Sequence, residues 1–324
     1  MRRLLAVTLV LAGLAGPALA ADDTLVLYTS QPNTDAQKTA DAFMAANPGV
    51  KVEWVRDGTP KIIAKLRAEI AAGSPQPDVL LISDVVTMES LKKDNLLQAY
   101  QSAKTAGFQA DLMDKDHTYF STKLITTGIV YNKKAPFVPT SWLDLKKPEA
   151  KGQVTMPSPL TSGAAMIHAV TLASNLSDGW NYFSALAKNG ATAAGGNGDV
   201  ETAVAGGDKL YGMIVDYLPI REAAKGAPVA FVFPKEGVSA VTEPVAILKS
   251  AKHLELAQKF VDFVLSDAGQ KLWASMGYIP ASADVALPPG YPDRASIKVL
   301  GYDAAQAVAN DADNKAKFSD IFSQ

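Results

Sequence analysis

The sequence predicts an α/β fold of two lobes, on three observations. The chain has 324 residues, more than one simple hydrophobic core ordinarily organises, so two domains are expected. In its N-terminal part, short apolar strands alternate with amphipathic helices, as in the βαβ units of a parallel sheet. Two later apolar stretches, 124–132 and 238–248, are long enough to pass from one domain to the other. We therefore expect two α/β lobes joined by two crossover strands, with polar strand ends converging on a cleft.

The first twenty residues have the features of a secretory signal peptide. Arg2 and Arg3 form a short basic region, residues 4–14 are apolar, and Ala18-Leu19-Ala20 is a small-residue cleavage motif. The apolar run is too short to cross a bilayer. We therefore predict cleavage after residue 20 and export to the periplasm.

The composition argues against several classes of function. The chain has no cysteine, which excludes thiolate catalysis, iron–sulfur clusters, cysteine-ligated zinc and a lipid anchor on a lipobox cysteine. Its 31 Lys and Arg stand against 33 Asp and Glu, and this mildly acidic balance is unfavourable for nucleic acid or an anionic membrane.

The first lobe is predicted as a parallel sheet. We expect strands at 24–28, 50–55 and 77–82, separated by a helix with Ala40 and Phe43 on one face and by a helix over 61–72. Ligands of such sheets bind beyond the carboxyl ends of the strands. Ser30, Thr59 and Asp84 stand at these ends, so we expect them in the cleft.

The stretch 157–165 predicts an anion site in the second lobe. After a strand at 153–156, Thr161 or Ser162 can cap a helix, and Gly163 leaves the backbone of its first turn uncovered. The first N–H groups of a helix lack intrahelical partners and carry a partial positive charge. An ordinary capped helix is the alternative interpretation.

The remaining elements follow the same pattern. We expect helices at 180–188 and 200–205, strands at 209–215 and 229–233, and a mainly helical C-terminal part from Lys252 with a proline-rich break at 287–292. The strand 209–215 ends in Asp216 and Tyr217, and a glycine-rich turn at 195–199 carries Asn197.

Several segments, in order and spacing, resemble periplasmic solute-binding proteins of ABC importers. They are the signal peptide, 27–30, 77–80, 128–132, 157–165 and 260–269. The resemblance is to the cluster of ferric, hexose-phosphate and 2-aminoethylphosphonate binders. It implies a type II fold with the ligand in the interlobe cleft, hinge closure, a monomer, and ABC permease subunits as partners. We place lobe 1 at 21–124 plus 243–324, with C-terminal helices that can also pack on lobe 2, and lobe 2 at 125–242.

The resemblance also implies site residues. In the ferric branch a Ser-Gly-Ala helix start holds a phosphate, which here corresponds to Ser162, Gly163 and Ala164, with help from Asn197. The tyrosine pair that binds iron in that branch is reduced to Tyr217, so no metal is expected. The segments 211–216 and 233–237 look like the organophosphonate branch.

We therefore expect a small organophosphonate or phosphate ester as ligand, with 2-aminoethylphosphonate as the first choice and hexose phosphate or a ferric anion as alternatives. The expected phosphonate contacts are Thr161, Ser162, Gly163, Ala164 and Asn197, with Ser30 and Thr59 from the facing lobe. Asp216 and Asp84 are the candidates for the ligand ammonium, with Tyr217 or Tyr28 as a lid. For Asp84 the alternative is a helix N-cap. Arg56 and Asp57 are expected to form an internal ion pair or a turn rather than to contact the ligand.

No catalytic residues or cofactor are expected. The three histidines are far apart in sequence, and Ser162-Gly163 lacks the leading glycine of a nucleophile elbow. A dyad of Asp216 and Glu243 in a secreted hydrolase is the alternative from another class.

Overall fold

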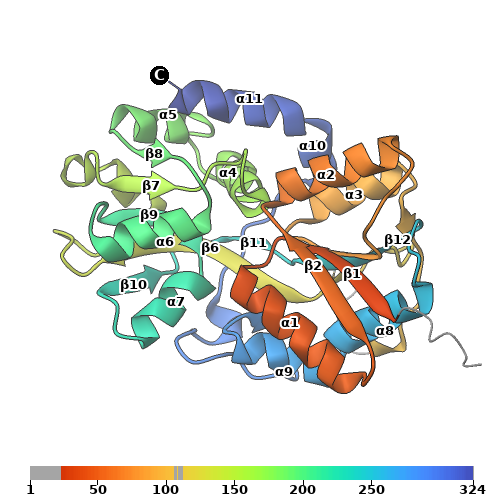
Figure 1. Cartoon of the computed structure of the whole chain (residues 1–324). Helices are drawn as coiled ribbons and strands as arrows, with labels where there is room; N and C mark the ends of the chain where they lie inside the picture. The colour runs from red at the N-terminus through yellow and green to blue at the C-terminus, as the bar shows by residue number, and fades with distance from the viewer. Residues whose placement is uncertain (1–22, 106–107, 109–111, 324) are drawn as a thin grey trace, which may run out of the picture.

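The computed structural model describes residues 23–105, 108 and 112–323. The predicted signal peptide at 1–20 lies outside the described residues. Two β-sheets flanked by helices make up a two-lobed α/β structure, as expected (Figure 1). None of the helices in the described part of the chain has the length and apolar character of a membrane-spanning helix.

Lobe 1 is built on a sheet with the strand order β2-β1-β3-β12-β4, in which β5 also pairs with β12. Its strands are β1 (Thr24–Thr29), β2 (Lys51–Arg56), β3 (Val79–Leu81), β4 (Leu97–Gln98), β5 (Phe120–Ser121) and β12 (Pro244–Leu248). Its first helices are α1 (Asn33–Ala46), α2 (Thr59–Ala71) and α3 (Val85–Lys93). Strand β1 is parallel to β2 and β3, so the predicted βαβ arrangement is confirmed.

Lobe 2 is built on a sheet with the order β10-β6-β9-β7-β8, in which β11 and β13 also pair with β6. Its strands are β6 (Lys123–Asn132), β7 (Val154–Met156), β8 (Thr192–Ala193), β9 (Tyr211–Val215), β10 (Val229–Val232), β11 (Ser239–Val241) and β13 (Ile279–Pro280). Its helices are α4 (Gly163–Asn175), α5 (Asn181–Lys188), α6 (Asn197–Gly206) and α7 (Tyr217–Ala224). Short 3-10 helices are η1 (Ala103–Thr105), η3 (Trp142–Lys146), η4 (Pro148–Ala150) and η5 (Arg294–Ser296).

The chain passes between the sheets at two adjacent points. After β5 it enters β6 at Thr122 and Lys123, and both N–H groups donate to the carbonyl of Thr242 on the returning segment (3.1 and 3.3 Å). The predicted strand 238–248 is two strands, because Glu243 has a φ of +38° and breaks the extended chain between β11 and β12. The lobe limits 21–124 plus 243–324 and 125–242 stay a prediction, with both boundaries close to these crossings.

The C-terminal helices bridge the two lobes. After α8 (Leu254–Leu265) and α9 (Asp267–Ser275), α10 (Ala304–Ala309) packs on α3 of lobe 1. The last helix, α11 (Asp311–Phe322), packs on α4 and α5 of lobe 2, where Phe318 lies 5.8 Å from Phe183 between ring centroids. In Figure 1, α10 and α11 run along the top of the molecule from one lobe to the other.

Candidate functional site

A cavity of about 490 Å³ lies between the lobes, and we call it the cleft cavity. Eight of the ten predicted site residues line it: Ser30, Thr59, Thr161, Ser162, Gly163, Ala164, Asn197 and Tyr217. Asp84 and Asp216 do not. Both lobes and the crossing segments contribute to the lining, since Ile125, Val241 and Glu243 also face it.

The N-terminus of α4 presents hydrogen-bond donors to the cleft cavity. Ser162 is the N-cap, and its Oγ accepts from the N–H of Ala165 (3.3 Å) and from Nδ2 of Asn197 (3.2 Å). Because Oγ already accepts two hydrogen bonds, its own proton is left for another acceptor. Among the described residues, the N–H groups of Gly163 and Ala164 have no acceptor. The predicted helix start is therefore present and carries oriented donors of the kind that bind anions, while the anion site itself stays a prediction.

Two further residues fix this geometry. The amide of Asn197 bridges from Ser162 to β9, because its Oδ1 accepts from the N–H of Val215 (3.2 Å). The Thr161 hydroxyl donates to the carbonyls of Ser158 (3.0 Å) and Gly195. Thr161 therefore ties the turn before α4 to the glycine-rich turn before α6, and its proton is already used.

The lobe 1 wall carries hydroxyl groups and a cation. The Oγ of Ser30 is buried and has no hydrogen-bond partner among the described residues. The hydroxyls of Thr59 and Ser83 lie 2.9 Å apart. Arg56 lines the cavity and donates from Nε to the carbonyl of Gln31 (2.7 Å).

Arg56 is the cation of the cleft cavity lining that has no ion-pair partner among the described residues. Of the other charged residues in the lining, Asp57 pairs with Lys61 at 3.6 Å and Glu243 pairs with Lys123. Asp199 accepts from the N–H of Gly196 (2.6 Å). The expected ion pair of Arg56 with Asp57 does not form. Asp57 instead accepts from the N–H of the adjacent Gly58 (2.7 Å). Sequence reasoning missed Arg56 as a site residue. It stands at the carboxyl end of β2, which is the same signal that selected Thr59.

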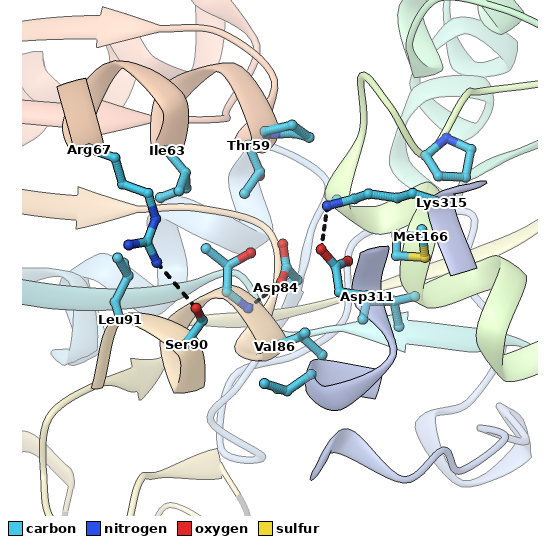
Figure 2. A pocket seen from close by; sticks show the side chains of 16 residues that line it. Thr59, Ile63, Arg67, Asp84, Val86, Ser90, Leu91, Met166, Asp311 and Lys315 are labelled. Atoms are coloured by element: carbon cyan, nitrogen blue, oxygen red, sulfur yellow. Dashed lines mark hydrogen bonds and ion pairs between the residues drawn. The ribbon is translucent and has the colours of Figure 1, made fainter. Parts of the chain in front are cut away.

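Asp84 is a helix cap. Its Oδ1 accepts from the N–H of Thr87 (2.7 Å) at the start of α3, and the residue is 4% exposed. Burial raises the pKa of Asp84. It lines a second cavity of about 320 Å³ between α2, α3, α4 and the C-terminal helices. Figure 2 shows this second cavity, with Ile63 and Arg67 on one side and Met166, Asp311 and Lys315 on the other.

Asp216 points into the protein and not into the cleft. It is 0% exposed, and its carboxylate accepts from the N–H and hydroxyl of Thr126 on β6 (2.9 and 2.6 Å) and from the N–H of Tyr217 (2.7 Å). Burial raises its pKa to about 6, although the three donors favour the charged form. A ligand ammonium therefore cannot reach Asp216 in this conformation, and the supposed dyad of Asp216 with Glu243 does not form in the cavity.

Of the two tyrosines suggested as a lid, only one lines the cleft cavity. Tyr28, a suggested lid, is 2% exposed, does not line the cleft cavity, and donates its hydroxyl to Glu69 (2.7 Å). Tyr217 does line the cavity, and burial raises the pKa of its phenol. No group of three or more His, Cys, Asp or Glu side chains suited to a metal ion occurs in the described part of the chain.

Against the ring of Tyr217 lies a cluster of charged and aromatic side chains that we call the hinge cluster, because it adjoins the crossing segments. Its members are Asp35, Lys123, Arg221, Glu243, Trp273 and Tyr278. Lys123 pairs with Glu243 across the two crossings, and its Nζ lies 3.6 Å from the Trp273 ring centroid. Arg221 of α7 pairs with Asp35 of α1 at 2.9 Å, and Tyr278 donates to the same Asp35 oxygen (2.5 Å). Burial lowers the pKa of Lys123 and raises that of Glu243.

Comparison with known proteins gives consistent matches over the chain. Residues 74–308 match the model of a family described as bacterial extracellular solute-binding proteins. A probable ABC transporter periplasmic-binding protein of Sinorhizobium fredii, y4fP, is 26% identical over 82% of this chain and 76% of its own. A Fe(3+)-binding periplasmic protein of Serratia marcescens is 25% identical over 79% of this chain and 77% of its own.

Among solved structures, the chain is similar to the periplasmic binding protein AfuA from Actinobacillus pleuropneumoniae with exogenous fructose-6-phosphate bound. The two share 25% identity with a TM-score of 0.84, over 93% of this chain and 98% of that one. These similar proteins are binding proteins and not enzymes.

Proposed function

The chain belongs to the bacterial extracellular solute-binding proteins, the substrate-binding components of ABC transporters, and we propose that its ligand is a small molecule with a phosphoryl group. The observation that carries this proposal is the donor set at the start of α4. The N–H groups of Gly163 and Ala164 and the Ser162 hydroxyl proton have no acceptor in the described part of the chain, and all three residues line the cleft cavity.

The facing lobe supports the same ligand class. Arg56 contributes a cation without an ion-pair partner among the described residues, and Ser30 contributes a buried hydroxyl without a partner. A tetrahedral dianion bound between them would receive donors from both lobes at once. Such a ligand stabilises the closed arrangement selectively, which is how hinge closure couples binding to delivery.

Within this class we retain 2-aminoethylphosphonate as the first ligand to test. Its ammonium needs an acceptor other than Asp216 or Asp84. Glu243 lines the cavity but is already paired with Lys123, so the carboxylates of Asp57 and Asp199 are the acceptors that the lining offers. Hexose phosphate is the second candidate, because the similar protein AfuA was solved with fructose-6-phosphate. On this proposal, the protein binds its ligand in the periplasm, where its relatives reside, and delivers it to permease subunits.

The test is thermal unfolding of ligand-stripped mature protein with 2-aminoethylphosphonate, inorganic phosphate, fructose-6-phosphate, glucose-6-phosphate or Fe(III) with phosphate. A ligand at about 100 times its dissociation constant adds about 2.7 kcal/mol to the unfolding free energy, a shift of a few degrees. A shift with Fe(III) and phosphate alone would contradict the proposed ligand class.

Ser162→Ala tests the site itself. The variant removes a donor to a charged oxygen, so we expect the affinity for the active phosphoryl compound to fall about tenfold or more. Ser266→Ala is the matched control, because Ser266 also caps a helix by accepting an N–H, from Gly269 (3.3 Å), but it lies outside the cleft cavity lining. Both variants lose a cap, and only Ser162→Ala should lose affinity.

A further inference from the structure

We propose that Gly58 and Gly163 set how far the lobes close, because each lets the facing lobe approach where any side chain would collide. We call this contact the glycine seam; it consists of Gly58 and Gly163 with the groups of Ser83, Asp84 and Thr161 that they face. The proposal depends on closure of a two-lobed binding protein and not on which ligand is bound.

Gly58 of lobe 1 lies against the backbone of lobe 2. A Cβ built on Gly58 would stand 2.1 Å from the carbonyl oxygen of Thr161 and 3.2 Å from its carbon. Main-chain atoms cannot rotate away as a side-chain end can, so one lobe would have to move. Gly58 itself has a φ of −59° and a ψ of 146°, which any L-residue adopts. Its own turn therefore does not require glycine, and the requirement comes from the facing lobe.

Gly163 of lobe 2 makes the reciprocal contact. Its built Cβ would stand 2.4 Å from Oδ2 of Asp84 and 3.0 Å from Oγ of Ser83. These side chains have little freedom to move, because Asp84 caps α3 and the Ser83 hydroxyl bonds that of Thr59. The seam thus explains why Asp84 is buried although it stands at a strand end facing the cleft.

The position of the seam links the distance between the lobes to the geometry of the candidate ligand site. Thr59 and Gly163 line both the cleft cavity and the second cavity of Figure 2, so the seam lies between the two. Gly163 also begins the helix that presents the anion donors. A Cβ that held α4 away from lobe 1 would separate those donors from Ser30, Thr59 and Arg56, and a ligand could then contact only one lobe.

Gly58→Ser is the variant that isolates this effect. Serine adds the colliding Cβ, yet it is a preferred N-cap residue, and Gly58 is the N-cap of α2. The variant therefore keeps or improves the local stability of lobe 1 while it obstructs closure. Gly198→Ala is the matched control, because Gly198 also lines the cleft cavity but a Cβ there meets nothing within 4 Å.

Closure can be measured by crosslinking two introduced cysteines, because the chain has no cysteine of its own. Cysteines introduced at Lys61 on α2 and Leu218 on α7 would line the cleft cavity from opposite lobes. A short bifunctional thiol reagent then captures closed molecules in ligand-free protein, even when they are a minor population. We expect the crosslinking rate to fall about tenfold or more with Gly58→Ser and to stay at the parent value with Gly198→Ala.

Two outcomes would overturn the proposal. Crosslinking of Gly58→Ser at the parent rate would show that closure tolerates the Cβ, and no crosslinking in the parent would show that the closed contact is not reached. Gly163→Ala, with a milder collision, provides the second variant and should slow crosslinking in the same direction. Because no ligand is added, these results are independent of the ligand panel, so failure of the phosphoryl proposal and failure of the seam are distinguishable.

Discussion

The two lobes meet in two places that differ sharply in chemistry. At the hinge cluster, Lys123 pairs with Glu243 and Arg221 with Asp35. Lys123, Glu243 and Asp35 are buried, and the Arg221 side chain is 23% exposed. At the glycine seam, Gly58 approaches the Thr161 carbonyl, and Gly163 approaches the Asp84 carboxylate, which caps α3, and the Ser83 hydroxyl.

This difference follows from what each contact has to do. Burying a charge pair costs desolvation, and separating it again leaves both charges to be satisfied anew. The crossing segments stay hydrogen-bonded to each other through Thr122 and Thr242, so a charge pair there can remain assembled. A contact that opens and closes around a ligand is better made without ion pairs across it, as at the glycine seam. The comparison therefore predicts that hinge variants change the stability of the fold and that seam variants change closure.

Lys123→Met should give the largest effect. It leaves the Glu243 carboxylate buried without its partner, and loss of one member of a buried pair costs about 3–5 kcal/mol of unfolding free energy. Urea unfolding measures the change. The double variant Lys123→Met/Glu243→Gln removes both charges and should cost clearly less than the single one. Equal costs for single and double variants would show that the charges do not interact.

His168 connects the two regions and should give a medium effect that depends on pH. It lies on α4, whose first residue is at the seam, and its Nδ1 is 2.8 Å from Oγ of Ser239 on β11, which leads into the hinge. Burial lowers its pKa from the usual 6.5 to about 3. The unfolded chain therefore takes up a proton below about pH 6.5 that the folded protein refuses, so His168 makes stability fall as the pH is lowered through this range.

Between about pH 7.5 and pH 5, we expect this proton to cost the parent about 2 kcal/mol of unfolding free energy. His168→Gln keeps a hydrogen-bonding group towards Ser239 but does not titrate. Over the same pH range, its unfolding free energy should therefore fall by about 2 kcal/mol less than that of the parent. Urea unfolding of both proteins at several pH values gives the comparison. Parallel pH profiles would mean that His168 is protonated equally in both states.

Gly58→Ser should give the smallest effect on stability. The substitution suits an N-cap and collides only when the lobes close, so the unfolding free energy of ligand-free protein should change by no more than about 0.5 kcal/mol. The same urea series measures it. A loss of unfolding free energy as large as that of Lys123→Met would show that Gly58 is needed for the stability of the fold. The hinge cluster and the glycine seam would then not differ in the way predicted.

The local part of the site could be predicted from the sequence. The stretch 157–165 contains a proline turn, a capping serine and a glycine. These residues favour a helix start with free N–H donors through local interactions, which do not depend on the rest of the fold. Polar residues at the ends of β1 and β2 mark the cleft for a similar reason, because parallel strands end at a common edge. Ser30 and Thr59 were identified in this way, and Arg56 at the same edge could have been.

Only the tertiary structure decided which acids line the cleft cavity. Asp216 and Asp84 both follow strands, but the sequence does not show that Thr126 on the neighbouring strand β6 supplies donors to Asp216, or that Gly163 covers Asp84. Glu243, over a hundred residues from its partner Lys123, could not be recognised as half of a buried pair. Sequence patterns report what a residue does to its own segment, whereas the direction of a side chain and the distance between lobes depend on segments far away along the chain.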